Sequence, residues 1–174
     1  SLLIVEVPMS NLTFTENAAT SAYRARTSVL ALIKDASGKV VKRFSRDLPL
    51  TGPSDKIAMV KSGNFVYREN LTLAPGKYTL ETAASDGEGN QFGARTQPVE
   101  IGAPAGVGLS NLFLVRNYQQ GVKDLTKEEP LQFNGGRVTP SMTGRIVGSP
   151  GTTLAVFFTV YPDGSSAKPE LTIE

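Results

Sequence analysis

The residue types that most often carry out chemistry in proteins are missing from this chain. Its 174 residues include no histidine and no cysteine. Histidine is the usual general base near neutral pH and the commonest metal ligand, and cysteine is the source of reactive thiolates. Zinc hydrolases and sites of the Ser-His-Asp or Cys-His type are therefore excluded within these residues. Carboxylate, lysine, tyrosine or Ser-Lys chemistry remains, but the acids are scattered, and adjacent Glu128 and Glu129 lie in a polar stretch typical of a solvated loop.

Three turn-like segments place acidic oxygens next to glycine, as calcium sites do. None has the spacing of an EF-hand loop, and Asp and Gly are also the residues that ordinary β-turns require. Asp86 and Glu88 form the better calcium candidate, with a plain turn as the alternative, and no other metal or cofactor is expected. The segments are Asp35-Ala36-Ser37-Gly38-Lys39, Ser85-Asp86-Gly87-Glu88-Gly89-Asn90 and Pro162-Asp163-Gly164-Ser165-Ser166.

The charge distribution selects no class of partner. The chain carries 18 basic and 16 acidic residues, and neither half is strongly basic. Nucleic-acid binding proteins usually concentrate Lys and Arg on one surface, and no such cluster stands out, so no nucleic acid is expected. No apolar run reaches the roughly 18 residues of a membrane-spanning helix. The lack of cysteine does not fix the compartment, because exported proteins without disulfides are common.

The elements that would position any site are strands. Seven strand-like runs in about 100 residues are separated by Gly, Pro, Asn and Asp, which is the pattern of an immunoglobulin-like sandwich. We therefore predict an all-β fold, with an antiparallel β-sandwich over residues 1–103. The runs are residues 2–7, 12–15, 23–34, 40–48, 65–73, 78–84 and 91–101.

Two connections within this unit have recognisable chemistry. Asp35-Ala36-Ser37-Gly38 predicts a tight turn with positive φ at Gly38, and so a hairpin between its flanking strands. Residues 53–62 are the one convincing helical stretch, because Ile57, Val60 and Lys61 fall at helical spacing. Ser54 is the expected N-cap of this helix of one or two turns.

The segment Pro75-Gly76-Lys77-Tyr78 has the pattern of a tyrosine corner. In that motif a Tyr near the start of a strand donates its hydroxyl to a backbone group a few residues upstream, which fixes the arch between two sheets. We predict structural roles for Pro75, Gly76 and Tyr78. The alternative is that Tyr78 contacts a ligand.

A second β segment is expected over residues 107–174, after a linker at residues 102–106, with strands at residues 109–117, 131–140, 144–147, 152–161 and 169–174. The run at 154–161 is apolar on both faces and needs cover on both sides. We therefore expect an incomplete unit, truncated at its C-terminus in a natural chain that continues past residue 174; alternatively, the segment adds strands to the first unit. An unfinished sheet leaves an unpaired edge, which predicts a homodimer or edge contact near residues 152–174.

Several of these runs resemble the C-terminal β-sandwich region of von Willebrand factor A-related exported proteins of acidobacteria. The resemblance spans most of the chain and implies a bacterial protein that is periplasmic or extracellular, with its A-type domain upstream of Ser1. The Asp-x-Ser-x-Ser metal motif of that domain does not occur here, so its metal role transfers to no residue. The matching runs are Val5-Glu6-Val7-Pro8, Leu12-Thr13-Phe14-Thr15-Glu16, residues 30–41, Gly63-Asn64-Phe65, residues 73–80 and residues 157–162.

These observations favour a non-catalytic structural or protein-interaction module with an unidentified protein partner. The alternative is a carbohydrate-binding β-sandwich, although such modules usually present a flat row of Trp and Tyr and this chain has no Trp and five Tyr. A third hypothesis is an enzyme that uses lysine and carboxylates, which would require a concave pocket with clustered acids or a lysine of displaced pKa.

Overall fold

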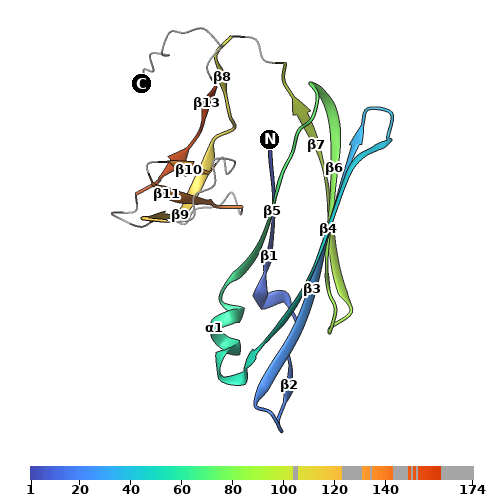
Figure 1. The fold of residues 1–174 in the computed structure, drawn as a ribbon, viewed down its shortest axis with the longest axis vertical. Helices are drawn as coiled ribbons and strands as arrows, with labels where there is room; N and C mark the ends of the chain where they lie inside the picture. The colour runs from blue at the N-terminus through green and yellow to red at the C-terminus, as the bar shows by residue number, and fades with distance from the viewer. Residues whose placement is uncertain are drawn as a thin grey trace. The chain divides into compact units, whose positions relative to one another are not determined.

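The computed structural model describes residues 1–103, 106–122, 131–133, 135–142, 149, 151 and 153–161. The chain divides into two compact units, Ser1–Ala103 and Pro104–Glu174, at the linker that the sequence indicated. Strands dominate the described part of each unit (Figure 1). The predicted all-β class is therefore confirmed.

The first unit is built around a five-stranded antiparallel sheet. Its central strand β3 (Ala22–Asp35) pairs with β4 (Val40–Pro53) on one side. On its other side β3 pairs with the short β2 (Thr15–Asn17) and then with β6 (Gly76–Asp86), and β7 (Gln91–Ile101) pairs with β6. Within the described residues β4 and β7 form the two edges of this sheet.

The β3–β4 hairpin turns as predicted. Gly38 has φ +85°, a conformation that glycine adopts without steric cost. The Asp35 carboxylate accepts hydrogen bonds from the backbone N–H groups of Ser37 and Lys39, at 2.9 and 3.1 Å. These bonds stabilise the turn, because they give the two backbone N–H groups an acceptor within the turn itself.

β4 continues five residues beyond the predicted end at Leu48. These five residues all pair with β3, and the last pair is Pro53 with Ala22. The sequence prediction stopped early because proline rarely lies inside a sheet. Pro49 is tolerated because β4 is an edge strand, where a missing N–H leaves no partner unsatisfied.

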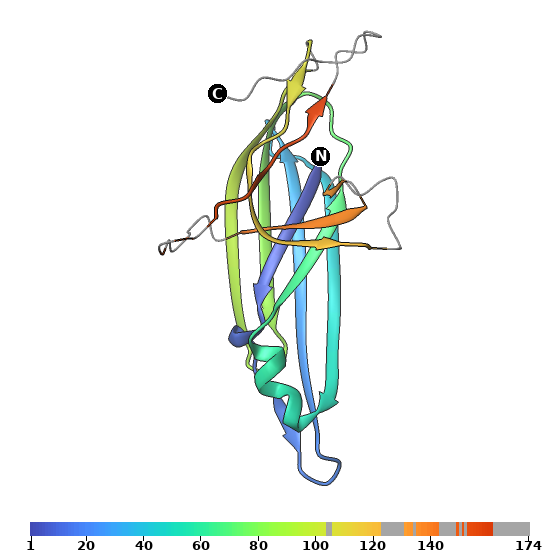
Figure 2. The same cartoon turned by 90° about the vertical axis from the view of Figure 1, so that its left-hand side faces the viewer.

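A second layer covers one face of the large sheet. β1 (Leu2–Pro8) and β5 (Asn64–Asn70) form an antiparallel ribbon with seven residue pairs. Figure 2 shows this ribbon in front of β3 and β6. The seven strands of the first unit are thus arranged as five against two.

The core lies between these layers and follows the alternation of the strands. Odd-numbered residues of β3 face the ribbon and even-numbered ones face away, because successive side chains of a strand point to opposite faces. Ala31 is completely buried and Ile33 is 3% exposed. The buried residues of the two core clusters are Leu3, Ala31, Ile33 and Leu80, and Val7, Met9, Leu12 and Val29.

The connection from β4 to β5 contains the predicted helix, but Ser54 is not its N-cap. A 3-10 turn, η2 (Ser54–Lys56), comes first and α1 (Ile57–Lys61) follows, with no side-chain cap bond at either start. The backbone N–H of Ser54 donates to the Ser21 carbonyl at 2.9 Å. Ser54 therefore still extends the end of β4, and the α-helix begins three residues later.

Another 3-10 turn, η1 (Met9–Asn11), follows β1 and precedes the extended piece predicted at residues 12–15, whose first residue Leu12 is extended. Only Thr15 of that piece belongs to a strand, the start of β2. No helix in the part of the chain described here has the length and apolarity needed to span a membrane.

In the second unit, β9 (Phe113–Gln120) pairs with β11 (Gly136–Pro140) and with β12 (Val156–Phe157). β10 (Gln132–Phe133) extends this sheet beside β11, while β8 (Gly108–Leu109) pairs with β13 (Val160–Tyr161). The predicted continuous strand over 152–161 is therefore two short ones, each paired on one side. The expected strands at 144–147 and 169–174 lie outside the described residues.

Candidate protein-interaction surface

The face of the large sheet that points away from the β1–β5 ribbon is the candidate site, and we call it the outer sheet face. In an antiparallel ladder, paired residues lie on the same face, so the register identifies its members. Leu30 pairs with Ser45 on β4 and with Ala83 on β6, and Ala83 pairs with Ala94 on β7. The full set used below is Ser28, Leu30, Leu32, Lys34, Arg43, Ser45, Asp47, Glu81, Ala83, Ser85, Phe92, Ala94 and Thr96.

A shallow depression of about 460 Å³ lies on this face. Leu30 lines it together with the small side chains of Ser28, Ser45, Ala83 and Ser85. The short side chains beside Leu30 leave this part of the sheet surface low, and Arg26, Asp47 and Phe92 also line the depression. We call it the sheet depression.

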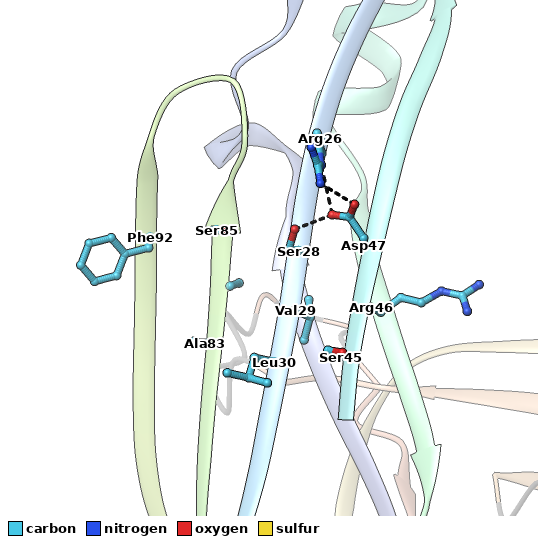
Figure 3. Close-up of a pocket in the computed structure, with 11 residues that line it drawn as sticks. Arg26, Ser28, Val29, Leu30, Ser45, Arg46, Asp47, Ala83, Ser85 and Phe92 are labelled. Carbon is cyan, nitrogen blue, oxygen red and sulfur yellow. Dashed lines mark hydrogen bonds and ion pairs between the residues drawn. The ribbon is translucent and has the colours of Figure 1, made fainter. Parts of the chain in front are cut away.

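Phe92 stands at the rim of the sheet depression and does not fill it. Figure 3 shows its ring turned away from Leu30 and Ser85. The residue is 84% exposed, the largest value among the exposed large hydrophobic residues of the described chain. An isolated exposed Leu or Val is ordinary, but a fully projecting phenylalanine beside an apolar depression is a typical contact residue.

An ion pair borders the sheet depression on the β4 side. The Nε and Nη2 atoms of Arg26 donate hydrogen bonds to the Asp47 carboxylate, at 3.1 and 2.7 Å. The Ser28 hydroxyl donates to the same carboxylate at 2.5 Å (Figure 3). The hydrogen bonds from Arg26 and Ser28 lower the pKa of Asp47 below its ordinary value, and the same contact raises the pKa of Arg26. This border is therefore fixed in geometry and locally neutral.

The Tyr78 hydroxyl donates a 2.8 Å hydrogen bond to the carbonyl of Ala74, four residues upstream. This is the contact that the sequence predicted for a tyrosine corner. Gly76 has φ +155°, and the Tyr78 ring lies over it, with the nearest ring carbon 3.7 Å from the position that a Cβ would occupy. Pro75 and Gly76 thus form the arch, and Tyr78 closes it and packs against the core.

We expect Tyr78→Phe to lower the free energy of unfolding by about 1 kcal/mol, the typical net value of one hydrogen bond. Urea denaturation followed by circular dichroism measures the change. Tyr161→Phe is the matched control, because its ring is 52% exposed in the second unit and should alter stability by less than about 0.5 kcal/mol. A Tyr78→Phe protein as stable as the control would contradict the role of the hydroxyl.

The carboxylates of Asp86 and Glu88, the calcium candidate, accept hydrogen bonds from other groups of the protein. Asp86 is 5% exposed, and its carboxylate accepts the backbone N–H groups of Thr13 at 2.9 Å and Glu88 at 3.2 Å. Glu88 forms an ion pair with Arg24 at 3.1 Å. The two carboxylates thus accept from different protein groups. Among the described residues no group of three or more acids, histidines or cysteines converges.

The remaining buried ionisable groups also belong to the scaffold. Burial and a 2.8 Å hydrogen bond to Glu69 raise the pKa of Tyr67 to about 12, so this phenol stays protonated at neutral pH. Tyr67 packs against both core clusters. Tyr23 is 7% exposed, and its ring meets that of Phe14 edge-on at 5.2 Å. In the described residues these tyrosines form no exposed row of the kind that binds sugars.

The sequence predictions missed Phe92 and the outer sheet face. The sequence of residues 91–98 did carry a signal. Neither its odd-numbered nor its even-numbered residues form an apolar set that could face a core. Phe92 shares its face with Ala94 and Thr96, while Gly93 and Arg95 occupy the other. A strand with no core face is an edge strand, and an aromatic residue on it is exposed.

Comparison of the chain with protein-family models, with curated proteins and with solved structures finds no match.

Proposed function

We propose that this chain is a non-catalytic structural or protein-interaction module of an exported bacterial protein, and that the outer sheet face is its binding surface. The observation that carries the proposal is the projecting Phe92, 84% exposed, beside an apolar depression that the described residues of the first unit leave open. Aromatic residues, phenylalanine included, are enriched at protein interfaces relative to the rest of the surface.

The rest of the unit supports this role as a rigid frame. The sandwich core lies behind the outer sheet face, and the Tyr78–Ala74 and Asp86–Thr13 hydrogen bonds fix two of its connections. A surface built on paired strands keeps its geometry better than one built on loops, which favours specific recognition. Export is part of the proposal because of the resemblance carried by the runs at residues 5–8, 30–41 and 73–80.

Site-specific photo-crosslinking tests the proposed surface. A benzophenone amino acid at position 92 should give a saturable adduct with a protein when the chain is mixed with the exported proteins of its source organism. The matched control carries the same group at Met59, which is 66% exposed on α1. Equal background labelling from both positions would contradict the proposal.

The edge contact predicted near residues 152–174 stays a separate prediction. Val156 pairs with Leu114 and Val160 pairs with Leu109, so both described strands of this stretch have one partner within the unit. Leu154 and Val156 are 56% and 52% exposed, which leaves apolar surface there. Residues 162–174 lie outside the described part of the chain.

A further inference from the structure

The outer sheet face carries a projecting apolar side chain and an apolar depression, which are complementary in shape and polarity. Phe92 projects from β7, while Ser28 and Leu30 of β3 line the sheet depression. We propose that this face binds a second copy of the chain, with Phe92 of each copy in the sheet depression of the other. The inference rests on the proposed function and deepens it by naming the partner.

The register gives this arrangement a simple geometry. Phe92 pairs with Ser85, and Ser85 pairs with Ser28, so β7 and β3 flank β6. Neighbouring strands lie about 4.8 Å apart, which puts the projection and the recess about 10 Å apart across β6. A two-fold axis that runs along β6, between two facing sheets, exchanges these positions. Each Phe92 then lies over the partner's recess, as an isologous contact requires.

The side chains beneath the axis permit close approach. Ala83 and Ser85 of β6 are small and half-buried, and Ala94 beside them on β7 is also small. Face-to-face sheets pack about 10 Å apart with interdigitated side chains, so large residues of one copy need small residues opposite them. The small residues therefore suit the place where two copies would meet.

The charges of the face are compatible with a second copy of itself. Arg26 is paired with Asp47 at 2.7 Å, and Lys34 is paired with Glu81 at 2.7 Å. Glu81 would face its own copy across the axis, but each carboxylate is already neutralised by Lys34. Arg43, on β4, would lie at opposite margins of the two copies, so the two guanidinium groups would stay apart.

The area available indicates a weak, reversible dimer. β3 pairs with β6 over residues 27–35, and β7 pairs with β6 on its other side. Because the axis runs along β6, the β4 strands lie outside the overlap of the two copies. Nine residues along and three strands across give roughly 30 Å by 14 Å, or about 860 Å² from both copies. That is below the size of stable interfaces and in the range of weak, transient ones. Concentration-dependent association is therefore the expected behaviour.

Sedimentation velocity of the full chain, from micromolar to millimolar concentration, tests the inference. The unmodified protein should shift from monomer to dimer, and Phe92→Ala should weaken the dimer by about tenfold or more. Phe92 is 84% exposed, so its truncation should leave the fold intact, as circular dichroism can verify. Met59→Ala, which removes a 66% exposed apolar side chain from α1, should leave the association unchanged. A monomer throughout the series, or equal effects of the two variants, overturns the inference.

A mixing experiment tests the reciprocal insertion itself. Ser45 is exposed and pairs with Leu30, so Ser45→Arg fills the sheet depression without touching Phe92. Each variant alone loses both contacts of the dimer. A mixture of Phe92→Ala and Ser45→Arg chains regains one contact, because an intact Phe92 meets an open depression. Stronger association of the mixture than of either variant supports the inference, and no gain overturns it.

Three further outcomes separate this inference from neighbouring proposals. If Val156→Lys abolishes the dimer while Phe92→Ala does not, the contact lies in the second unit and the inference is wrong. If the chain stays monomeric but position 92 still crosslinks to a different protein, the inference fails and the proposed function stands. If neither association nor crosslinking occurs, both fail.

Discussion

Replacing Ile33 with alanine is expected to lower the free energy of unfolding of the first unit by about 3 kcal/mol, within the usual range for a buried aliphatic truncation. Ile33 is 3% exposed and lies in the core cluster with Leu3, Ala31 and Leu80. Its neighbours come from both layers of the sandwich. A cavity at this point removes contacts on both sides, and paired strands relax poorly to fill it.

Leu32→Ala is the matched control for this prediction. Leu32 is the adjacent residue on the same strand, but it lies half-buried on the outer sheet face. Its truncation should cost about 1 kcal/mol, because less apolar surface is lost and no enclosed cavity forms. Urea titrations of the two variants give the comparison. Equal losses would show that the alternation assigned to β3 is incorrect.

Asp86→Ala is expected to cost about 2 to 3 kcal/mol, because hydrogen bonds to charged groups are strong and buried donors left unpaired are costly. The substitution leaves the backbone N–H groups of Thr13 and Glu88 without their acceptor. Glu88→Ala is the control. Its ion pair with Arg24 is at the surface, where Arg24 is 68% exposed, so the loss should stay below about 1 kcal/mol.

The same pair of variants distinguishes a structural carboxylate from a calcium ligand. A calcium site that used both acids would make the two variants similarly defective, and added calcium would raise the melting temperature of the unmodified chain. The hydrogen bonds predict unequal defects and no such rise. Thermal melts with calcium and with a chelator provide the measurement.

The stabilisation by Asp86 should also depend on pH. Burial raises the pKa of this carboxyl, but the hydrogen bonds from Thr13, Gly89 and Glu88 outweigh it and lower the pKa below 3.8. A lowered pKa in the folded state stabilises the fold at pH values above about 4, and this contribution is lost as the pH falls through the folded-state value. The stability difference between the unmodified chain and Asp86→Asn should therefore shrink in acid. A constant difference down to pH values well below 4 would contradict this account.

Local chemistry is what the sequence predicted well. Gly38 has positive φ, the helix lies between β4 and β5, and the Tyr78 hydroxyl reaches the Ala74 carbonyl. Each of these features depends on residues within about five positions of one another. The identities of Gly, Pro, Asp and Tyr therefore carry enough information to place them.

Features that depend on distant pairing were predicted poorly. The continuation of β4 to Pro53 requires pairing with Ala22, and the 3-10 start at Ser54 follows from a hydrogen bond to Ser21. The exposure of Phe92 depends on β7 having one neighbour, β6, in the described sheet. The lack of a core face in residues 91–98 is a local signal, but only the register shows that β7 ends the sheet and which residues share a face with Phe92.

The prolines of the two edge strands limit how copies of this chain can accumulate. Pro49 in β4 and Pro98 in β7 lack the N–H that an incoming strand would need at those positions. Growth by lateral addition, which has no natural end and produces fibres, is thereby discouraged at both sides. Contact through a broad face related by two-fold symmetry stops at a pair. At high concentration the first unit should therefore give a finite particle in solution rather than an insoluble polymer.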